Sequence, residues 1–247
     1  MSDAGDHLTS MNMEGAYVKT FKMGESRGIV KSDKPRVIYD ALSIMKRSRL
    51  ELKKYLRRHP LFQYSLSPLN PLEGAPEVAV RMAEASTRAD VGPMAAVAGA
   101  LMDVALSGVM KHHPNLVVIE NGGEVVAYSK TQVNVMIYAG PRTPIGRRLG
   151  FTLKEFPRGV GTSSATVGGG LTFGEADSVT VIAENAALAD AAATSICNQV
   201  QGSNIPGSIE KGLRKAKEIK GLESVVIIRE GHVGLGGRPL ELFLVRS

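Results

Sequence analysis

A β-branched run that leads directly into an alanine-rich segment constrains the fold of this chain most. Residues 179–182 read as a buried strand, and the segment that follows, up to Cys197, reads as a helix. This helix carries Asp190 and Thr194, which are four residues apart and therefore project from the same face. Burying a carboxylate among alanines is costly unless a cation or a hydrogen-bond donor meets it.

Two interpretations of Asp190 and Thr194 are open at this point. Their oxygens could hold a hard cation such as Mg²⁺, which takes oxygen ligands and keeps several waters. Alternatively, Asp190 is an ordinary solvent-facing residue on a packed helix. The spacing alone does not separate the two.

The composition is typical of a globular protein with a large core. The chain has 247 residues, 43% of them hydrophobic, and no Trp. Its single cysteine, Cys197, excludes an intramolecular disulfide, and we expect a buried, inert thiol in a cytoplasmic protein. Residues 1–14 are polar and predict a disordered leader. No apolar run approaches the length of a membrane span, so we expect no membrane partner.

Positive charge is concentrated in one predicted helix, at about 36–58. The net charge of the chain is +6, and the segment 44–58 combines a basic outer face with apolar positions at helical spacing. A solvated helix face is the simpler interpretation, because no aromatic platform accompanies the charges. Nucleic acid is therefore an improbable partner, although the phosphates of a bound nucleotide remain a possible one.

The order of the predicted elements indicates an α+β fold with an internal repeat. We expect strands at 17–22, 28–31, 116–119, 124–128, 132–138, 150–156, 178–183, 224–228 and 240–245, and helices at 36–58, 77–87, 94–110, 185–200 and 206–220. Residues 117–119 and Gly123 match 225–227 and Gly231 at a constant offset of 108. Each half, about 15–130 and 131–247, then reads strand–strand–helix–helix–strand–strand. This predicts one domain over 15–247.

Three small-residue turns are candidate ligand contacts. The turn from Asp90 through Gly92 precedes a helix whose first N–H groups could meet a phosphate. The turn 121–124, Asn-Gly-Gly-Glu, is either a plain hairpin turn or a close approach of backbone to a ligand. Residues 158–170 are rich in glycine and hydroxyls, as in phosphate-binding loops and in mobile connectors.

In this order the motifs resemble the ApbE superfamily of flavin transferases. The matching pieces are Asp90-Val-Gly92, Asn121-Gly-Gly-Glu124, Thr162-Ser-Ser164, and Ala-Asp-Ala-Ala-Ala-Thr at 189–194. They span about residues 75 to 200, and the helix motif is the most specific. The chain is most similar to a smaller ApbE-like family of soluble proteins from archaea and anaerobic bacteria.

The resemblance implies a duplicated T-fold-type arrangement that binds FAD with Mg²⁺. Asp190, Thr194 and a main-chain carbonyl near Gly92 or Pro93 would hold the metal. The residues implied to contact the cofactor are Asp90, Gly92, Asn121, Gly122, Gly123, Glu124, Thr162, Ser163 and Ser164.

The chain departs from the ApbE pattern where that family carries out transfer. Ala96 stands near the family's lysine, and residues 164–178 contain no histidine. We therefore expect a protein that binds a flavin or a related anionic small molecule and does not transfer FMN. The alternative is a non-catalytic or partner-dependent accessory protein in anaerobic sulfur, homocysteine or cofactor metabolism, as a homo-oligomer or with a metabolic partner.

Overall fold

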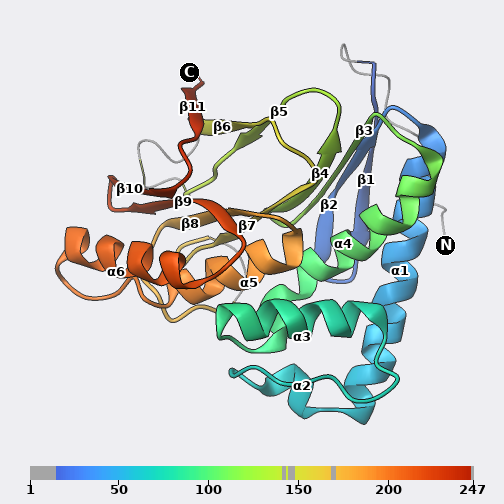
Figure 1. Ribbon diagram of the computed structural model, residues 1–247, viewed down its shortest axis with the longest axis horizontal. Helices are drawn as coiled ribbons and strands as arrows, with labels where there is room; N and C mark the ends of the chain where they lie inside the picture. Colours follow the sequence, from blue (N-terminus) through green and yellow to red (C-terminus); the bar gives the residue numbers. More distant parts are fainter. Residues whose placement is uncertain (1–14, 141–142, 144–147, 168–170, 246–247) are drawn as a thin grey trace.

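An eight-stranded antiparallel sheet forms the centre of the molecule (Figure 1). The computed structural model describes residues 15–140, 143, 148–167 and 171–245, so the predicted leader 1–14 lies outside the described residues. In their order across the sheet, the strands are β1 (Tyr17–Met23), β2 (Ser26–Ser32), β3 (Leu116–Asn121), β4 (Glu124–Ser129), β7 (Arg158–Ser163), β8 (Ser178–Ala183), β9 (Leu222–Arg229) and β10 (His232–Gly237).

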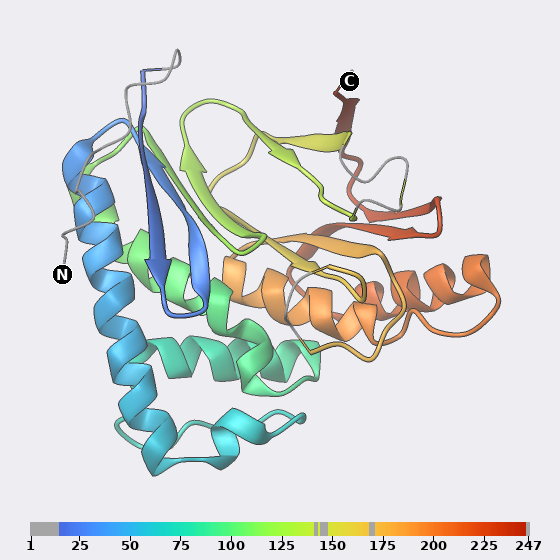
Figure 2. The ribbon, with the colours of Figure 1, turned by 180° about the vertical axis from the view of Figure 1, so that it is seen from behind.

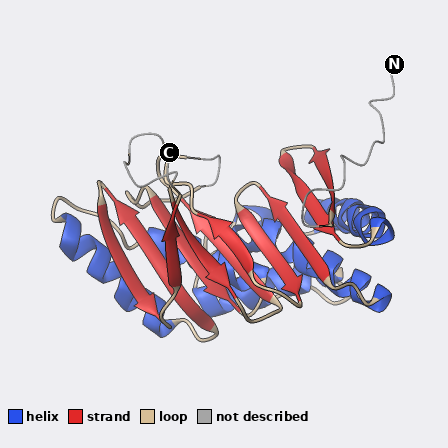
Figure 3. Cartoon of the chain, turned by 90° about the horizontal axis from the view of Figure 1, so that it is seen from above, coloured by secondary structure: helices blue, strands red, loops and turns tan. Residues whose placement is uncertain are grey.

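The helices cover one face of this sheet, and a second sheet covers the other (Figure 3). The helices are α1 (Pro35–Arg58), α2 (Leu61–Tyr64), α3 (Glu77–Ala89), α4 (Val97–Val109), α5 (Ala186–Cys197) and α6 (Ile205–Glu218), with 3₁₀ turns η1 (Pro93–Ala96) and η2 (Met110–His112). The second sheet contains β5 (Val133–Met136), β6 (Leu149–Leu153) and β11 (Glu241–Leu244). The mixed α+β architecture agrees with the sequence-based expectation.

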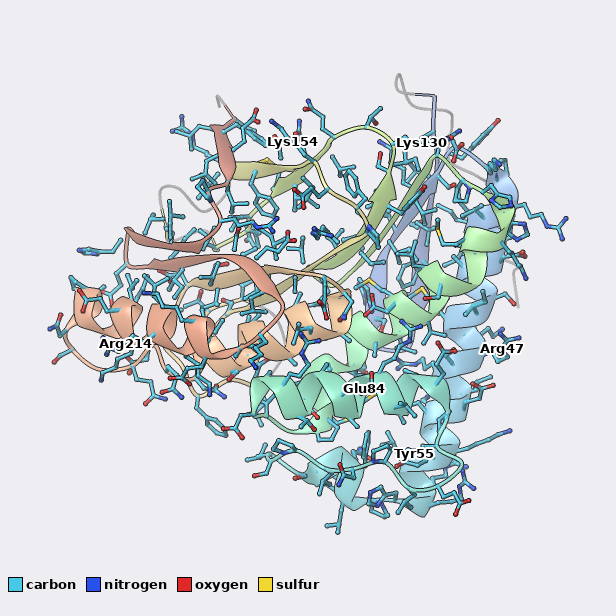
Figure 4. The ribbon with its side chains drawn as sticks, viewed as in Figure 1. Arg47, Tyr55, Glu84, Lys130, Lys154 and Arg214 are labelled. Carbon is cyan, nitrogen blue, oxygen red and sulfur yellow. The ribbon has the colours of Figure 1, made fainter. Side chains whose placement is uncertain are left out.

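Helix α1 follows the prediction for the basic segment. Pro35 occupies its first turn, where the missing N–H costs nothing, and the helix stops before Pro60. Its apolar side packs on α4 and the β1–β2 hairpin, which it flanks in Figure 2, while Arg47 points into solvent (Figure 4). Tyr55 turns inward, and its hydroxyl accepts a hydrogen bond from the Leu72 backbone N–H at 3.0 Å. This contact ties α1 to the connection after α2.

One helical stretch corrects the expectation about membrane spans. By length and composition alone, Pro93–His112 could cross a membrane. Its central part, α4, packs against α1, α3, α5 and strands β3 and β4, and it carries the buried Asp103. This stretch is apolar because it is a core helix.

Strand β7 corrects the interpretation of 158–170 as a loop. Arg158–Ser163 lies inside the main sheet, between β4 and β8. Gly159 and Gly161 gave this segment its loop-like composition, but both lie directly under α5. A Cβ at Gly161 would come within 2.4 Å of the Ala189 carbonyl oxygen. Small residues here mark a close approach of two backbones.

The strands predicted at 132–138 and 150–156 lie outside the main sheet. They form β5 and β6, which pair with each other and with the C-terminal β11. The main sheet instead reads β1-β2-β3-β4 and then β7-β8-β9-β10, with helices inserted between β2 and β3 and between β8 and β9. Asn121 pairs with Glu124 in the first half, and Arg229 pairs with His232 in the second, again 108 residues later.

Candidate functional site

A cavity of about 680 Å³ opens where five segments of the chain meet. Its walls come from residues 63–66, from 91–98 at the start of α4, from the β3–β4 turn, from the end of β7 and from one face of α5. Met136, Tyr138, Val167, Leu171 and Phe173 complete the lining. The size falls in the usual range of about 300–1,000 Å³ for small-molecule sites.

One stripe of α5 runs along the cavity. Asp190, Thr194 and Asn198 follow one another at intervals of four residues, so they share a helix face, and all three line the cavity. The sequence analysis identified Asp190 and Thr194 and missed Asn198. Continuing the four-residue spacing by one step would have found it.

The Asp190 carboxylate has a hydrogen-bonding partner inside the protein. Its Oδ2 accepts the Gly99 backbone N–H at 3.0 Å, at the start of α4. Burial nevertheless raises the pKa of Asp190 to about 7, because the N–H groups of Gly99 and Ala98 offset only part of the desolvation. Thr194 donates its hydroxyl to the Asp190 carbonyl at 3.4 Å. The helix predicted at 94–110 begins as the 3₁₀ turn η1, and the Asp190 carboxylate binds at the start of α4 that follows it.

Helices α4 and α5 cap each other. Asp190 of α5 meets the first N–H groups of α4, and Asp103 of α4 accepts the N–H groups of Ala186 (3.0 Å) and Ala187 (2.8 Å) at the start of α5. Each carboxylate lies at the positive end of the other helix, where negative charge is favoured. Gly99 lets the two backbones approach, since a Cβ there would lie 2.2 Å from the Ala186 carbonyl oxygen.

The turn between β3 and β4 brings a second carboxylate to the cavity. Gly122 and Gly123 have positive φ values of 73° and 118°, so the turn depends on glycine. The Gly123 N–H donates to the Glu120 carboxylate at 3.0 Å, and Glu124 reaches the cavity lining. Burial, together with the negative charges of Asp190 and Glu120, raises the pKa of Glu124 well above its ordinary value. Asp190 and Glu124 thus repel each other when both are ionised.

Hydroxyl groups from the end of β7 form another wall. Thr162, Ser163 and Ser164, the residues that the family resemblance singled out, all line the cavity. Ser164 Oγ accepts the N–H groups of Thr166 (3.1 Å) and Val167 (2.9 Å), which shapes the turn that follows. These two bonds fix the position of the Ser164 hydroxyl.

Two predicted residues do not line the cavity. Asp90 ends α3 in a left-handed conformation with φ 58°, and Asn121 is buried at the end of β3. Gly92, Gly122, Gly123, Glu124, Thr162, Ser163, Ser164, Asp190 and Thr194 all do. Nine of the eleven predicted residues thus meet in one place.

The ionisable side chains that line the cavity are acidic. Among its described lining residues, Asp190 and Glu124 are the charged ones, and Lys, Arg and His are absent. The described part of the chain contains no group of three or more His, Cys, Asp and Glu side chains that could hold a metal ion. The two carboxylates and the Thr194 hydroxyl do suit Mg²⁺, which binds through one or two carboxylates and keeps waters or phosphate oxygens as its other ligands.

The mouth of the cavity is apolar. Tyr64, Leu66, Met136, Tyr138, Leu171 and Phe173 line it and are exposed. They come from three separate segments, and sequence reasoning missed all of them because no local pattern links these segments. Exposed apolar side chains gathered around an opening are typical of a binding site.

Comparison with known proteins gives consistent matches over most of the chain. The family model described as "AbpE bacteria" matches residues 14–232. The UPF0280 protein of Methanocaldococcus jannaschii is 37% identical over 230 residues, which cover 92% of this chain and 93% of that protein. The UPF0280 protein of Methanopyrus kandleri is 38% identical over 220 residues, 88% and 89% of the two chains.

Solved structures share the fold at low sequence identity. The apo form of the flavinyl transferase ApbE from Pseudomonas stutzeri matches with a TM-score of 0.55 and 12% identity, over 92% of this chain and 94% of that one. The ApbE protein of Thermotoga maritima matches with a TM-score of 0.52 and 16% identity, over 90% and 97%.

Proposed function

Because the chain belongs to the AbpE bacteria family, an ApbE-like family, we propose that its cavity binds a flavin or a related anionic small molecule. One observation carries this proposal. Nine residues chosen from sequence motifs of flavin transferases, which are scattered between Gly92 and Thr194, line a single cavity. Its mixture of hydroxyls, glycine turns and apolar side chains fits a ligand with a ring system and a polar tail.

We propose that Mg²⁺ accompanies the ligand. FAD carries a negatively charged pyrophosphate, and the described lining offers it two carboxylates and no cationic side chain. Asp190 and Thr194 would hold the ion, with the main-chain carbonyl near Gly92 or Pro93 as a further oxygen. When bound, the ion supplies the positive charge that this lining lacks.

The residues of the chain favour binding over FMN transfer. Ala96 stands near the place of the lysine in the ApbE pattern, and residues 164–178 contain no histidine. A carboxyl group whose pKa lies near neutrality can both accept and donate a proton. Burial raises the pKa of Glu124 well above its ordinary value, so if the protein acts on its ligand, Glu124 is the carboxyl group left to donate a proton once Asp190 holds the metal.

We further propose a cytoplasmic protein whose residues 15–247 form one duplicated T-fold-type domain. The equal strand order in the two halves of the main sheet supports the duplication. The accessory role in sulfur metabolism gains less support. A persulfide carrier needs an accessible thiolate, whereas Cys197 is fully buried and burial raises the pKa of its thiol.

Calorimetric titration with FAD, with and without Mg²⁺, tests the proposed function. We expect Mg²⁺-dependent binding that is lost in Asp190→Ala. Asp177→Asn is the matched control, because Asp177 is a buried backbone acceptor outside the cavity, 2.7 Å from the Glu230 N–H. Absence of binding heat from the folded wild-type protein under both conditions would overturn the proposal.

A further inference from the structure

Residues 171–174 carry two exposed apolar side chains to the mouth of the cavity. Leu171 is 67% exposed and Phe173 is 57% exposed, and both line the cavity. Exposing a large aromatic ring to water forfeits the free energy that its burial would give. A bound ligand with an apolar surface would recover that free energy.

Two side chains just beyond α5 hold this segment in place. Asn198 Oδ1 accepts both the Phe173 backbone N–H at 2.8 Å and the Thr172 hydroxyl at 3.1 Å. Gln201 Nε2 donates to the Phe173 carbonyl at 2.7 Å and to the Asn198 carbonyl at 2.9 Å. The backbone on both sides of the Phe173 ring is thus fixed to the end of the helix that carries Asp190.

The backbone of the same segment lies against the end of α5. A Cβ at Gly174 would fall 1.9 Å from the Cys197 carbonyl oxygen, so the chain passes there in direct contact with the helix. The Gly174 N–H also donates to the Thr172 hydroxyl at 3.2 Å. The segment therefore has a defined position with respect to α5 even though its apolar side chains face solvent.

Other aromatic side chains stand at the same opening. Tyr64 is the last residue of α2 and is 72% exposed, and Tyr138 lies in the segment after β5. Together with Phe173 they bring aromatic faces from three parts of the chain to one mouth, above a lining that carries carboxylates and hydroxyls. The exposed aromatic rings thus offer a ring-accepting surface at the opening, whereas Asp190 is withdrawn further from solvent.

We propose that Phe173 is a wall of a subsite for the planar aromatic ring system of the ligand, and that Asn198 is the positioning residue that holds this wall. The inference rests on the proposed function and deepens it, since it assigns the ring to the mouth and the polar tail to the Asp190 end. Asn198 acts through its acceptor oxygen on the Thr172 hydroxyl and the Phe173 N–H, so its effect on ring binding passes through the segment.

The absence of Trp from the chain makes the proposal directly measurable. In Phe173→Trp, the new indole is the sole Trp and lies where the ring would stack. We expect riboflavin, which has the ring but no phosphate, to quench its emission in a saturable way, and ADP with Mg²⁺, which has no flavin ring, to leave it unchanged. Leu235→Trp on β10, exposed and outside the cavity lining, is the matched control that riboflavin should not quench saturably.

Variants at Asn198 test its positioning role. Asn198→Ala removes the acceptor, and we expect the affinity for riboflavin to fall about tenfold, the equivalent of one or two lost hydrogen bonds. Asn198→Asp keeps an acceptor oxygen for the Phe173 N–H and the Thr172 hydroxyl, so affinity for riboflavin should recover. Asn204→Ala is the control, because Asn204 caps α6 outside the cavity by accepting the Gly207 N–H at 3.0 Å.

The outcomes separate this inference from the proposed function. If wild-type protein binds riboflavin but Phe173→Trp shows no saturable quenching, the ring subsite lies elsewhere and the inference is wrong. If Asn198→Ala binds riboflavin as tightly as wild type, Asn198 does not position the wall. If folded wild-type protein binds neither riboflavin nor FAD, the proposed function itself fails.

Discussion

Replacing Asp190 by Asn is expected to stabilise the protein at alkaline pH. The Asn side chain has the same shape and keeps one acceptor oxygen for the Gly99 N–H, which Asp190 meets at 3.0 Å. It removes the negative charge that desolvation disfavours and that also raises the pKa of Glu124. The substitution therefore separates the helix-capping role of Asp190 from its charge.

The magnitude follows from the pKa of Asp190. Burial raises it from the usual 3.8 to about 7, so the folded protein binds this proton more tightly than the unfolded chain does. Stability is therefore highest below the unfolded pKa and falls as the pH rises from about 4 to 7. The pKa of Asp190 differs by about three units between the unfolded and folded protein, so the free energy of unfolding is about 4 kcal/mol lower above pH 7 than in acid. Asn avoids this loss but gives up one acceptor oxygen, at about 1 kcal/mol.

Urea unfolding followed by far-ultraviolet circular dichroism checks this expectation. At pH 8, Asp190→Asn should have a free energy of unfolding about 3 kcal/mol above wild type, and at pH 4 about 1 kcal/mol below it. Asp33→Asn is the control of opposite sign. Burial of Asp33 is outweighed by hydrogen bonds from Asn115 and Leu116, which lower its pKa, so ionised Asp33 stabilises the wild-type fold above the acid range. Asp33→Asn lacks that contribution and should be less stable than wild type at pH 8. Equal pH dependence of wild type and Asp190→Asn would refute the reasoning.

Two further predictions concern residues near α5. Gly161→Ala places a methyl group within 2.4 Å of the Ala189 carbonyl oxygen, so we expect about 3 kcal/mol of destabilisation in urea unfolding; an unchanged midpoint would mean that α5 shifts freely. Cys197 is buried and its thiol pKa is raised, so it should react with a thiol-specific disulfide reagent only after unfolding in urea, and rapid labelling of native protein would contradict its burial.

Local patterns predicted most helices and the hairpins β1–β2 and β3–β4. Proline at the first turn and helical spacing located α1, and the Asn-Gly-Gly turn located the β3–β4 hairpin. The same reasoning failed at β7, because Gly159 and Gly161 are typical of loops unless a helix backbone is known to lie on top of them. It also left β10 unassigned, since three of the six residues of that strand are glycine.

Residues of the candidate site could be predicted where they belong to a sequence motif. The resemblance to ApbE proteins led to Glu124 and Thr162, which are 38 positions apart in the chain (162 − 124) and line one cavity. It did not lead to Phe173 or Tyr64, because their role depends on the meeting of segments that share no pattern. Asp90 and Asn121 show the converse: residues within a matching motif that shape the backbone near the cavity without lining it.

The glycines of β7 have a consequence for how such a site could change over time. Gly159 and Gly161 do not line the cavity, yet a methyl group at either would push α5, with Asp190 and Thr194, away from the hydroxyls of Thr162 and Ser163. The distance between the backbones of β7 and α5 thus sets how far apart these two walls of the cavity stand. Relatives that accommodate thicker or thinner ligands could differ beneath the helix while every residue facing the ligand stays the same.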